Sequence, residues 1–152
     1  MEDTKVIKEI YERMDAINKK YGFYHKTLFH LHTPASHDFT LLSSWKHDQY
    51  AKADEKQIMQ CCMQKKVVPK REYLTDVSLD NERSIYITKK EWLSYILLAN
   101  ELVCDDYEIV VVTDHNSIAG INKIELAIKD IHKFKGSHEY PEIICGIEVS
   151  CA

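Results

Sequence analysis

The segment Glu108-Ile109-Val110-Val111-Val112-Thr113-Asp114-His115-Asn116 predicts the fold more directly than the rest of the 152-residue chain. Its continuous β-branched run is typical of a strand buried on both faces in a parallel sheet. Residues 117–135 follow with isoleucines at helical spacing and Gly136 at the end, which predicts a helix. A second apolar run over 143–149 completes a βαβ unit, whose crossover we expect to be right-handed.

Further elements are expected on the N-terminal side of this unit, where apolar spacing and turn-forming residues divide the chain. They are a helix over 4–20, a strand over 25–31, a loop over 33–48, a helix over 49–66, a short strand over 84–87 and a helix from 88 to about 102. Thr88 and Glu91 form a capping box at the start of the last helix, since the hydroxyl can accept from a free backbone N–H and the glutamate can reach back.

Composition narrows the class of protein. The chain is 45% hydrophobic and 29% charged with a formal net charge of −4, which predicts one globular domain. Nucleic acid stays open as a partner, but no Lys/Arg-rich block indicates it. Five cysteines without a C-x-x-C pair indicate reduced thiols in a cytoplasmic protein. Because the sequence has no signal-peptide pattern and no 18-residue apolar span, we expect no membrane partner.

Three short motifs stand at or just past the ends of the expected strands. They are His30-Leu31-His32-Thr33, Thr113-Asp114-His115-Asn116 and Gly146-Ile147-Glu148-Val149-Ser150. Residues i and i+2 of a strand share a face, so His30 and His32 can reach one metal ion. The carboxyl ends of parallel strands surround one cleft, onto which His115 and Glu148 would open. Asp38 or His37, in the loop after the first motif, could add a ligand.

This set of side chains favours a metal site. Imidazole and carboxylate groups suit zinc, manganese or iron. If Glu148 bridged two ions, one could hold a phosphoryl oxygen while the other lowered the pKa of water toward about 7. Asp114 is placed to orient His115 or another ligand. Each motif alone has a simpler interpretation, such as a helix cap for Asp114-His115-Asn116, but their combination at strand ends favours the metal site.

In this order the motifs resemble the first three motifs of the PHP family, named for polymerases and histidinol phosphatases, over residues 25–152. The resemblance implies a distorted (β/α)7 barrel that holds two or three zinc, manganese or iron ions and hydrolyses phosphate esters. By motif, His30 and His32 would bind the first ion and Glu148 would bridge. His115 would bind another ion with Asp38, for which His37 is the second choice.

A complete barrel of this type needs about 200 or more residues. We therefore expect an α/β fold that is an incomplete (β/α)7 PHP-type barrel, with its first three or four strands, flanking helices and a helical insert over about 39–106. Residues 1–152 would form a single PHP-type domain, truncated at its C-terminus before the later ligands of the family. An exposed strand edge seeks a partner, so we also expect a homodimer through 143–149.

The leading functional hypothesis is a metal-dependent phosphoesterase, or the N-terminal part of one, with Glu148 and Asp114 in catalysis and a phosphate ester or nucleotide as substrate. The alternative is a catalytically inactive PHP remnant that acts as a regulatory or docking domain. Ser36-His37-Asp38-Phe39 before a long insert is similar to PHP domains at the front of larger ATP-binding proteins. An amidohydrolase-type enzyme also uses H-x-H on its first strand, but Gly146-Ile147-Glu148-Val149-Ser150 favours the PHP family.

Overall fold

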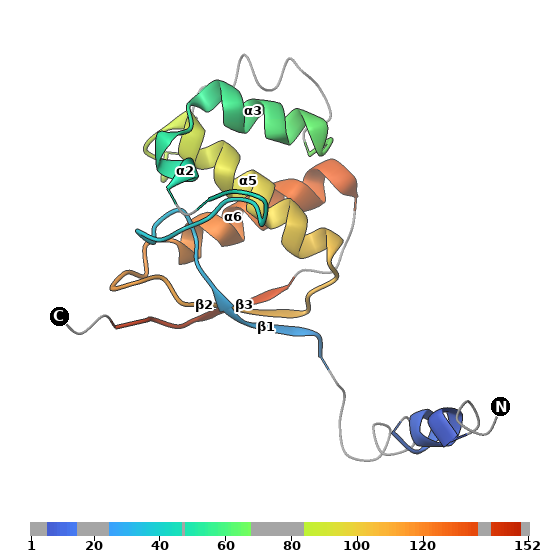
Figure 1. The fold of residues 1–152 in the computed structure, drawn as a ribbon. Coiled ribbons are helices and arrows are strands. Elements are labelled where there is room, and N and C mark those ends of the chain that lie inside the picture. The colour runs from blue at the N-terminus through green and yellow to red at the C-terminus, as the bar shows by residue number, and fades with distance from the viewer. Residues whose placement is uncertain (1–5, 15–24, 47, 68–83, 137–140, 150–152) are drawn as a thin grey trace.

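The described part of the chain is a mixed α/β fold built on a small parallel sheet (Figure 1). A computed structural model describes residues 6–14, 25–46, 48–67, 84–136 and 141–149. The sheet has three strands in the order β1-β2-β3, namely β1 (Thr27–Leu31), β2 (Ile109–Val112) and β3 (Glu142–Cys145). All are parallel, so their carboxyl ends lie at one edge of the sheet. This α/β class agrees with the expectation from sequence, and the barrel itself stays a prediction.

The helix between β2 and β3 follows the sequence pattern closely. It is α6 (Ile121–Lys135), and it ends at Gly136, which adopts a left-handed φ of 68°. Ile124, Ile128 and Ile131 form its buried face, with exposed fractions of 2% or less. The helix begins four residues later than expected, because 117–120 form a turn region that packs beneath the motif after β2.

The core of the molecule is α5 (Lys89–Cys104), which packs against both α6 and α3 (Glu55–Gln64). Trp92, Leu93 and Leu97 on α5 are at most 1% exposed. The Thr88 hydroxyl accepts from the Glu91 N–H at 3.1 Å, as the capping box predicts. The Glu91 carboxylate, however, accepts from the N–H of Ile87, one residue before the expected donor.

The insert differs from the expectation at two places. The single helix predicted over 49–66 is wrong, because α2 (Gln49–Lys52) ends at Ala53 in extended backbone and α3 starts after Asp54. Asp54 and Gln57 form a capping box that starts this second helix. Residues 84–87 form a turn and a bend, so the short strand predicted there is also wrong. Only 6–14 of the predicted helix over 4–20 lie within the described residues, and these are helical.

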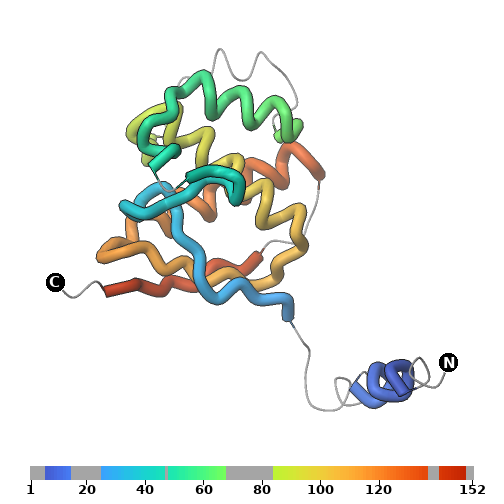
Figure 2. Tube along the Cα trace, viewed as in Figure 1, coloured from blue at the N-terminus to red at the C-terminus, as the bar shows by residue number. Residues whose placement is uncertain are grey.

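The two faces of the sheet are unequal. In Figure 1, α3, α5 and α6 lie on the same side of it, and Figure 2 follows the chain from β1 into the loop that leads to α2 on that side. Val110 and Val112 are buried, whereas Ile109 and Val111 are half-buried. The prediction of strands buried on both faces is therefore wrong for β2, and for β3, where Ile144 is 41% exposed.

β3 lies at the edge of the described sheet, and pairing of this edge with a second copy stays a prediction. Among the described residues, no helix has the length and apolar character needed to cross a membrane.

Candidate metal centre

Side chains from the three strand ends and one loop meet at the carboxyl edge of the sheet. They form two groups of three whose potential ligand atoms lie within 4.8 Å of one another. The groups are His30, His32 and Glu148, called the outer triad, and His32, Asp38 and His115, called the inner triad. The three motifs predicted from sequence thus converge, together with Asp38 from the loop after β1.

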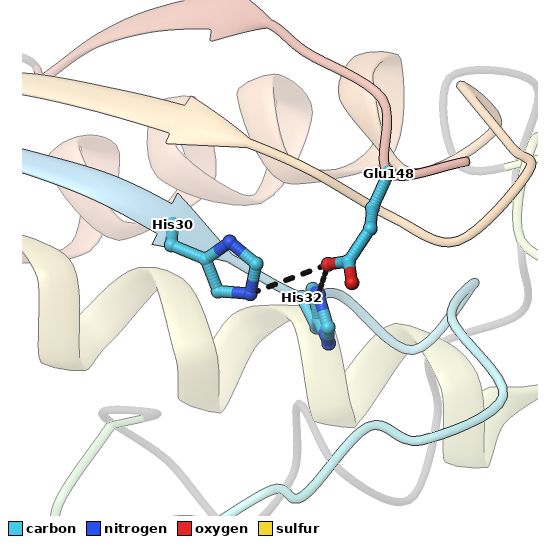
Figure 3. A group of neighbouring side chains, drawn as sticks. All are labelled: His30, His32 and Glu148. Atoms are coloured by element: carbon cyan, nitrogen blue, oxygen red, sulfur yellow. Dashed lines mark hydrogen bonds and ion pairs between the residues drawn. The ribbon is translucent and has the colours of Figure 1, made fainter. Parts of the chain in front are cut away.

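The outer triad is drawn in Figure 3, where both histidines lie beside the Glu148 carboxylate. Glu148 Oε2 is 3.5 Å from His30 Nε2 and 3.2 Å from His32 Nε2. The side chains of His30 and Glu148 are 62% and 41% exposed, so this triad opens to solvent.

The inner triad is less accessible. Asp38 Oδ1 is 2.9 Å from His32 Nδ1, and Asp38 Oδ2 is 3.2 Å from His115 Nε2. The side chains of Asp38 and His115 are 24% and 13% exposed. His32 links the triads through its two nitrogens, because Nδ1 faces Asp38 while Nε2 faces Glu148.

Glu148 also reaches both parts of the site with different oxygens. Oε2 faces the outer histidines, and Oε1 is 3.7 Å from His115 Nε2. Glu148 thus contacts members of both triads, and a bridge by Glu148 between two ions stays a prediction.

The backbone brings the motifs together by continuing the parallel pairing beyond the strands. His115 and Glu148 form an isolated parallel bridge. Asn116 donates its N–H to the Glu148 carbonyl at 2.9 Å and has a positive φ of 50°, a conformation that asparagine tolerates well. A Cβ at Gly146 would lie 3.0 Å from the Val112 carbonyl oxygen, so a glycine suits this close approach.

Ser36 supports the inner triad, a role that the motif pattern did not reveal. Its hydroxyl donates to Asp38 Oδ1 at 2.6 Å and accepts the His115 N–H at 3.3 Å. Burial raises the pKa of Asp38, whereas the hydrogen bond from Ser36 and the neighbouring His32 lower it, with a net pKa below the ordinary value. The Asp38 carboxylate is therefore held in its ionised, ligand-competent form.

Thr113 supports the outer triad in a simpler way. Its hydroxyl lies 3.1 Å from His30 Nδ1, which leaves His30 Nε2 directed at Glu148. A partner on one ring nitrogen fixes which nitrogen is available as a ligand. Thr113 was quoted within its motif, but nothing in the sequence pointed to this contact.

Asp114 does not orient His115 as expected. Its carboxylate is fully buried and accepts two hydrogen bonds from Thr33, one from the N–H at 2.6 Å and one from the hydroxyl at 2.7 Å. Neighbouring side chains along an extended segment point to opposite sides, so Asp114 points away from the side on which His115 lies. A role on the reacting atoms is therefore not favoured for Asp114, which instead links the first two motifs beneath the ligands.

His37 stands beside the site without joining either triad. Its ring centroid lies 4.7 Å from that of His115, and its side chain is exposed. Asp38, the first choice from sequence, is the residue whose carboxylate contacts His32 and His115.

Comparisons with known proteins add one relative. No protein-family model matches the chain, and no solved structure matches it. The chain is 34% identical over 147 residues to an uncharacterized protein of Streptococcus pneumoniae serotype 4 (strain ATCC BAA-334 / TIGR4). The match covers 96% of this chain and 56% of the relative, so the chain spans about half the length of that protein.

Proposed function

We propose that this chain carries the metal centre of a phosphoesterase of the PHP type, or the N-terminal part of such an enzyme. The observation that carries the proposal is the convergence of three histidines and two carboxylates at one sheet edge, with ligand atoms within 4.8 Å in each triad. Strand ends that gather at one edge are where enzymes with parallel sheets place their active sites.

The donor set fits divalent ions. Mixed imidazole and carboxylate ligands are those of zinc, manganese and non-haem iron sites. Within the described residues, the ion pairs of Asp38 and Glu148 are with histidines, and none is with lysine or arginine. Both carboxylates contact His115, at 3.2 Å from Asp38 and 3.7 Å from Glu148, so their negative charges face one part of the site and would favour a cation there.

Each side chain has a defined part in this proposal. His30, His32 and Glu148 would hold one ion, and Asp38 and His115, with the second Glu148 oxygen, would hold another. Asp38 also accepts from the ring of His32, which orients that ring as carboxylates do around many metal-bound histidines. The open outer side, where His30 is 62% exposed, is the side from which a phosphate ester would approach.

The bound ions would supply a Lewis acid for a phosphoryl oxygen and make water acidic enough to ionise near neutral pH. The chain's residues would hold these ions and exclude bulk water from the inner side. A nucleotide or a smaller phosphate ester is the expected substrate class.

The test combines metal analysis with hydrolysis of p-nitrophenyl phosphate in the presence of Mn²⁺. We expect ions to copurify or bind on addition, and hydrolysis to depend on them. His32→Ala should abolish both, whereas His25→Ala, which removes an exposed histidine paired with Glu108 outside the triads, should leave both unchanged. Absence of metal from the wild-type protein would contradict the proposal.

A catalytically inactive domain with a regulatory or docking role is the second candidate. It is favoured by the exposure of the outer triad, where the side chains of His30 and Glu148 are 62% and 41% exposed, because exposed ligands lose more entropy when they bind an ion. Replacing His30 and His32 with alanine in the full-length protein separates the two candidate functions. Unchanged biological activity would support docking, and its loss would support catalysis.

A further inference from the structure

A buried hydrogen-bond network lies directly beneath the two triads and belongs to neither. Asp114 and Thr33 are fully buried, and two hydrogen bonds of 2.6 and 2.7 Å join them. Thr33 immediately follows the ligand His32, and Asp114 immediately precedes the ligand His115. These two bonds therefore tie together the chain segments that carry the shared histidine and the inner histidine.

Tyr95 extends the network into the core helix α5. Its side chain is fully buried, and its hydroxyl is 3.0 Å from the Thr33 hydroxyl. Because the Thr33 hydroxyl donates to Asp114, it must accept from Tyr95, which makes the phenol a donor. Burial raises the pKa of Tyr95, which keeps this proton in place. The hydrogen bonds therefore run in one direction: Tyr95 donates to Thr33, and Thr33 donates to Asp114.

Gly120, at the start of α6, closes the network from the other side. A Cβ at this position would lie 2.2 Å from the Thr33 hydroxyl oxygen and 2.3 Å from Asp114 Oδ2. The Gly120 backbone has φ −74° and ψ −25°, which any residue can adopt. Space, rather than backbone conformation, is what requires glycine here.

We propose that Tyr95 and Gly120 are positioning residues of the metal centre. They fix the Thr33–Asp114 contact between two core helices, and this contact sets the distance between His32 and His115. The idea rests on the proposed function only in so far as the triads bind metal. The geometry that it concerns exists in the metal-free chain.

The first test compares two buried tyrosines by removing one hydroxyl from each. Tyr95→Phe deletes the donor to Thr33. Tyr86→Phe is the matched control, because the Tyr86 hydroxyl is also a donor, to the Lys123 carbonyl at 2.7 Å rather than to Thr33, and its ring lies tilted beside that of Tyr95, with centroids 5.6 Å apart. Mn²⁺ affinity is measured for each 152-residue variant, and the ring ¹⁵N signals of His32 and His115 are recorded without metal.

We expect Tyr95→Phe to weaken Mn²⁺ binding about tenfold, the lower end of the effect of removing groups that orient ligands. It should also shift both ring signals, whereas Tyr86→Phe should do neither. Equal effects of the two variants, or unmoved ring signals in Tyr95→Phe, would overturn the proposal. If the wild-type chain binds no Mn²⁺, the proposed function fails, and the ring signals alone decide the positioning role.

The second test adds one methyl group at each of two glycines. Gly120→Ala forces Thr33 and Asp114 apart, so the ring signals of His32 and His115 should move further than in Tyr95→Phe. Gly136→Ala adds the same methyl where no atom lies within 4 Å, although at a φ of 68° that strains alanine. It should lower thermal stability without moving those signals. Ring signals that move in both variants to the same extent would contradict the role of Gly120.

Discussion

The inner and outer triads share His32 but differ in how firmly the protein holds them. The other inner ligands, Asp38 and His115, are 24% and 13% exposed, and Ser36 contacts both. The outer residues His30 and Glu148 are 62% and 41% exposed, and the Thr113 hydroxyl lies 3.1 Å from the ring of His30. Preorganised, partly buried ligands bind metal more tightly than exposed ones, because less entropy is lost on binding. The comparison predicts a tight inner ion and a weaker outer ion that faces the substrate.

The largest effect is expected for His32→Ala, because this residue faces both triads. We expect metal affinity to fall by about 100-fold or more at the outer site, through loss of a ligand, and by about tenfold at the inner site, where the ring contacts Asp38. Isothermal titration with Zn²⁺ measures both affinities. An unchanged affinity at the inner site would show that the inner ion does not depend on His32.

A direct test of unequal sites compares His115→Ala with His30→Ala. Loss of the inner ligand should remove the tight ion, on the order of 100-fold in affinity, whereas loss of the outer ligand should cost on the order of tenfold at the weak ion. Competition with a chromogenic chelator measures the affinities of the tight and the weak ion separately in each variant. The ranking is wrong if His30→Ala removes the tighter ion.

Ser36→Ala probes the support of the inner triad. Loss of the hydroxyl removes an interaction that lowers the pKa of Asp38, so this pKa should rise toward the ordinary value of 3.8. A lowered folded pKa contributes stability above pH 3.8 that is lost as the pH falls through the folded value, and the variant should lose part of it. Carboxyl ¹³C titration of the metal-free chain measures the pKa of Asp38. An unchanged pKa in Ser36→Ala would contradict the role of Ser36 in lowering it.

The smallest effect is expected for Thr113→Val, which keeps the shape and removes the hydroxyl facing His30. Because His30 is 62% exposed, water can replace the lost partner, and outer-site affinity should fall only about threefold. Titration of both variants, Thr113→Val and Ser36→Ala, with metal compares their losses of affinity. A larger loss in Thr113→Val than in Ser36→Ala would reverse the assignment of the firmly held triad.

Local patterns in the sequence predicted the three strands of the sheet, the helix between β2 and β3, and the gathering of histidine and carboxylate side chains at the strand ends. Val110, Ile124 and His115 each follow from the periodicity or the motif around them. The break at Ala53 was also readable, because Asp54 and Gln57 have capping-box spacing. The exposure of β3 could not be predicted from the sequence, since it depends on which face of the sheet the helices cover. The role of Tyr95 could not be predicted either, because it contacts Thr33 from 62 residues away and belongs to no motif.

The bridge between His115 and Glu148 has a consequence for how the centre forms. Glu148 lies 116 residues after His32, so the ligand set is incomplete until β3 has docked in register beside β2. A slip of β3 by one residue would turn Glu148 to the opposite face, because side chains alternate along an extended chain. Metal capture by both triads would therefore report that the last described strand has been assembled correctly.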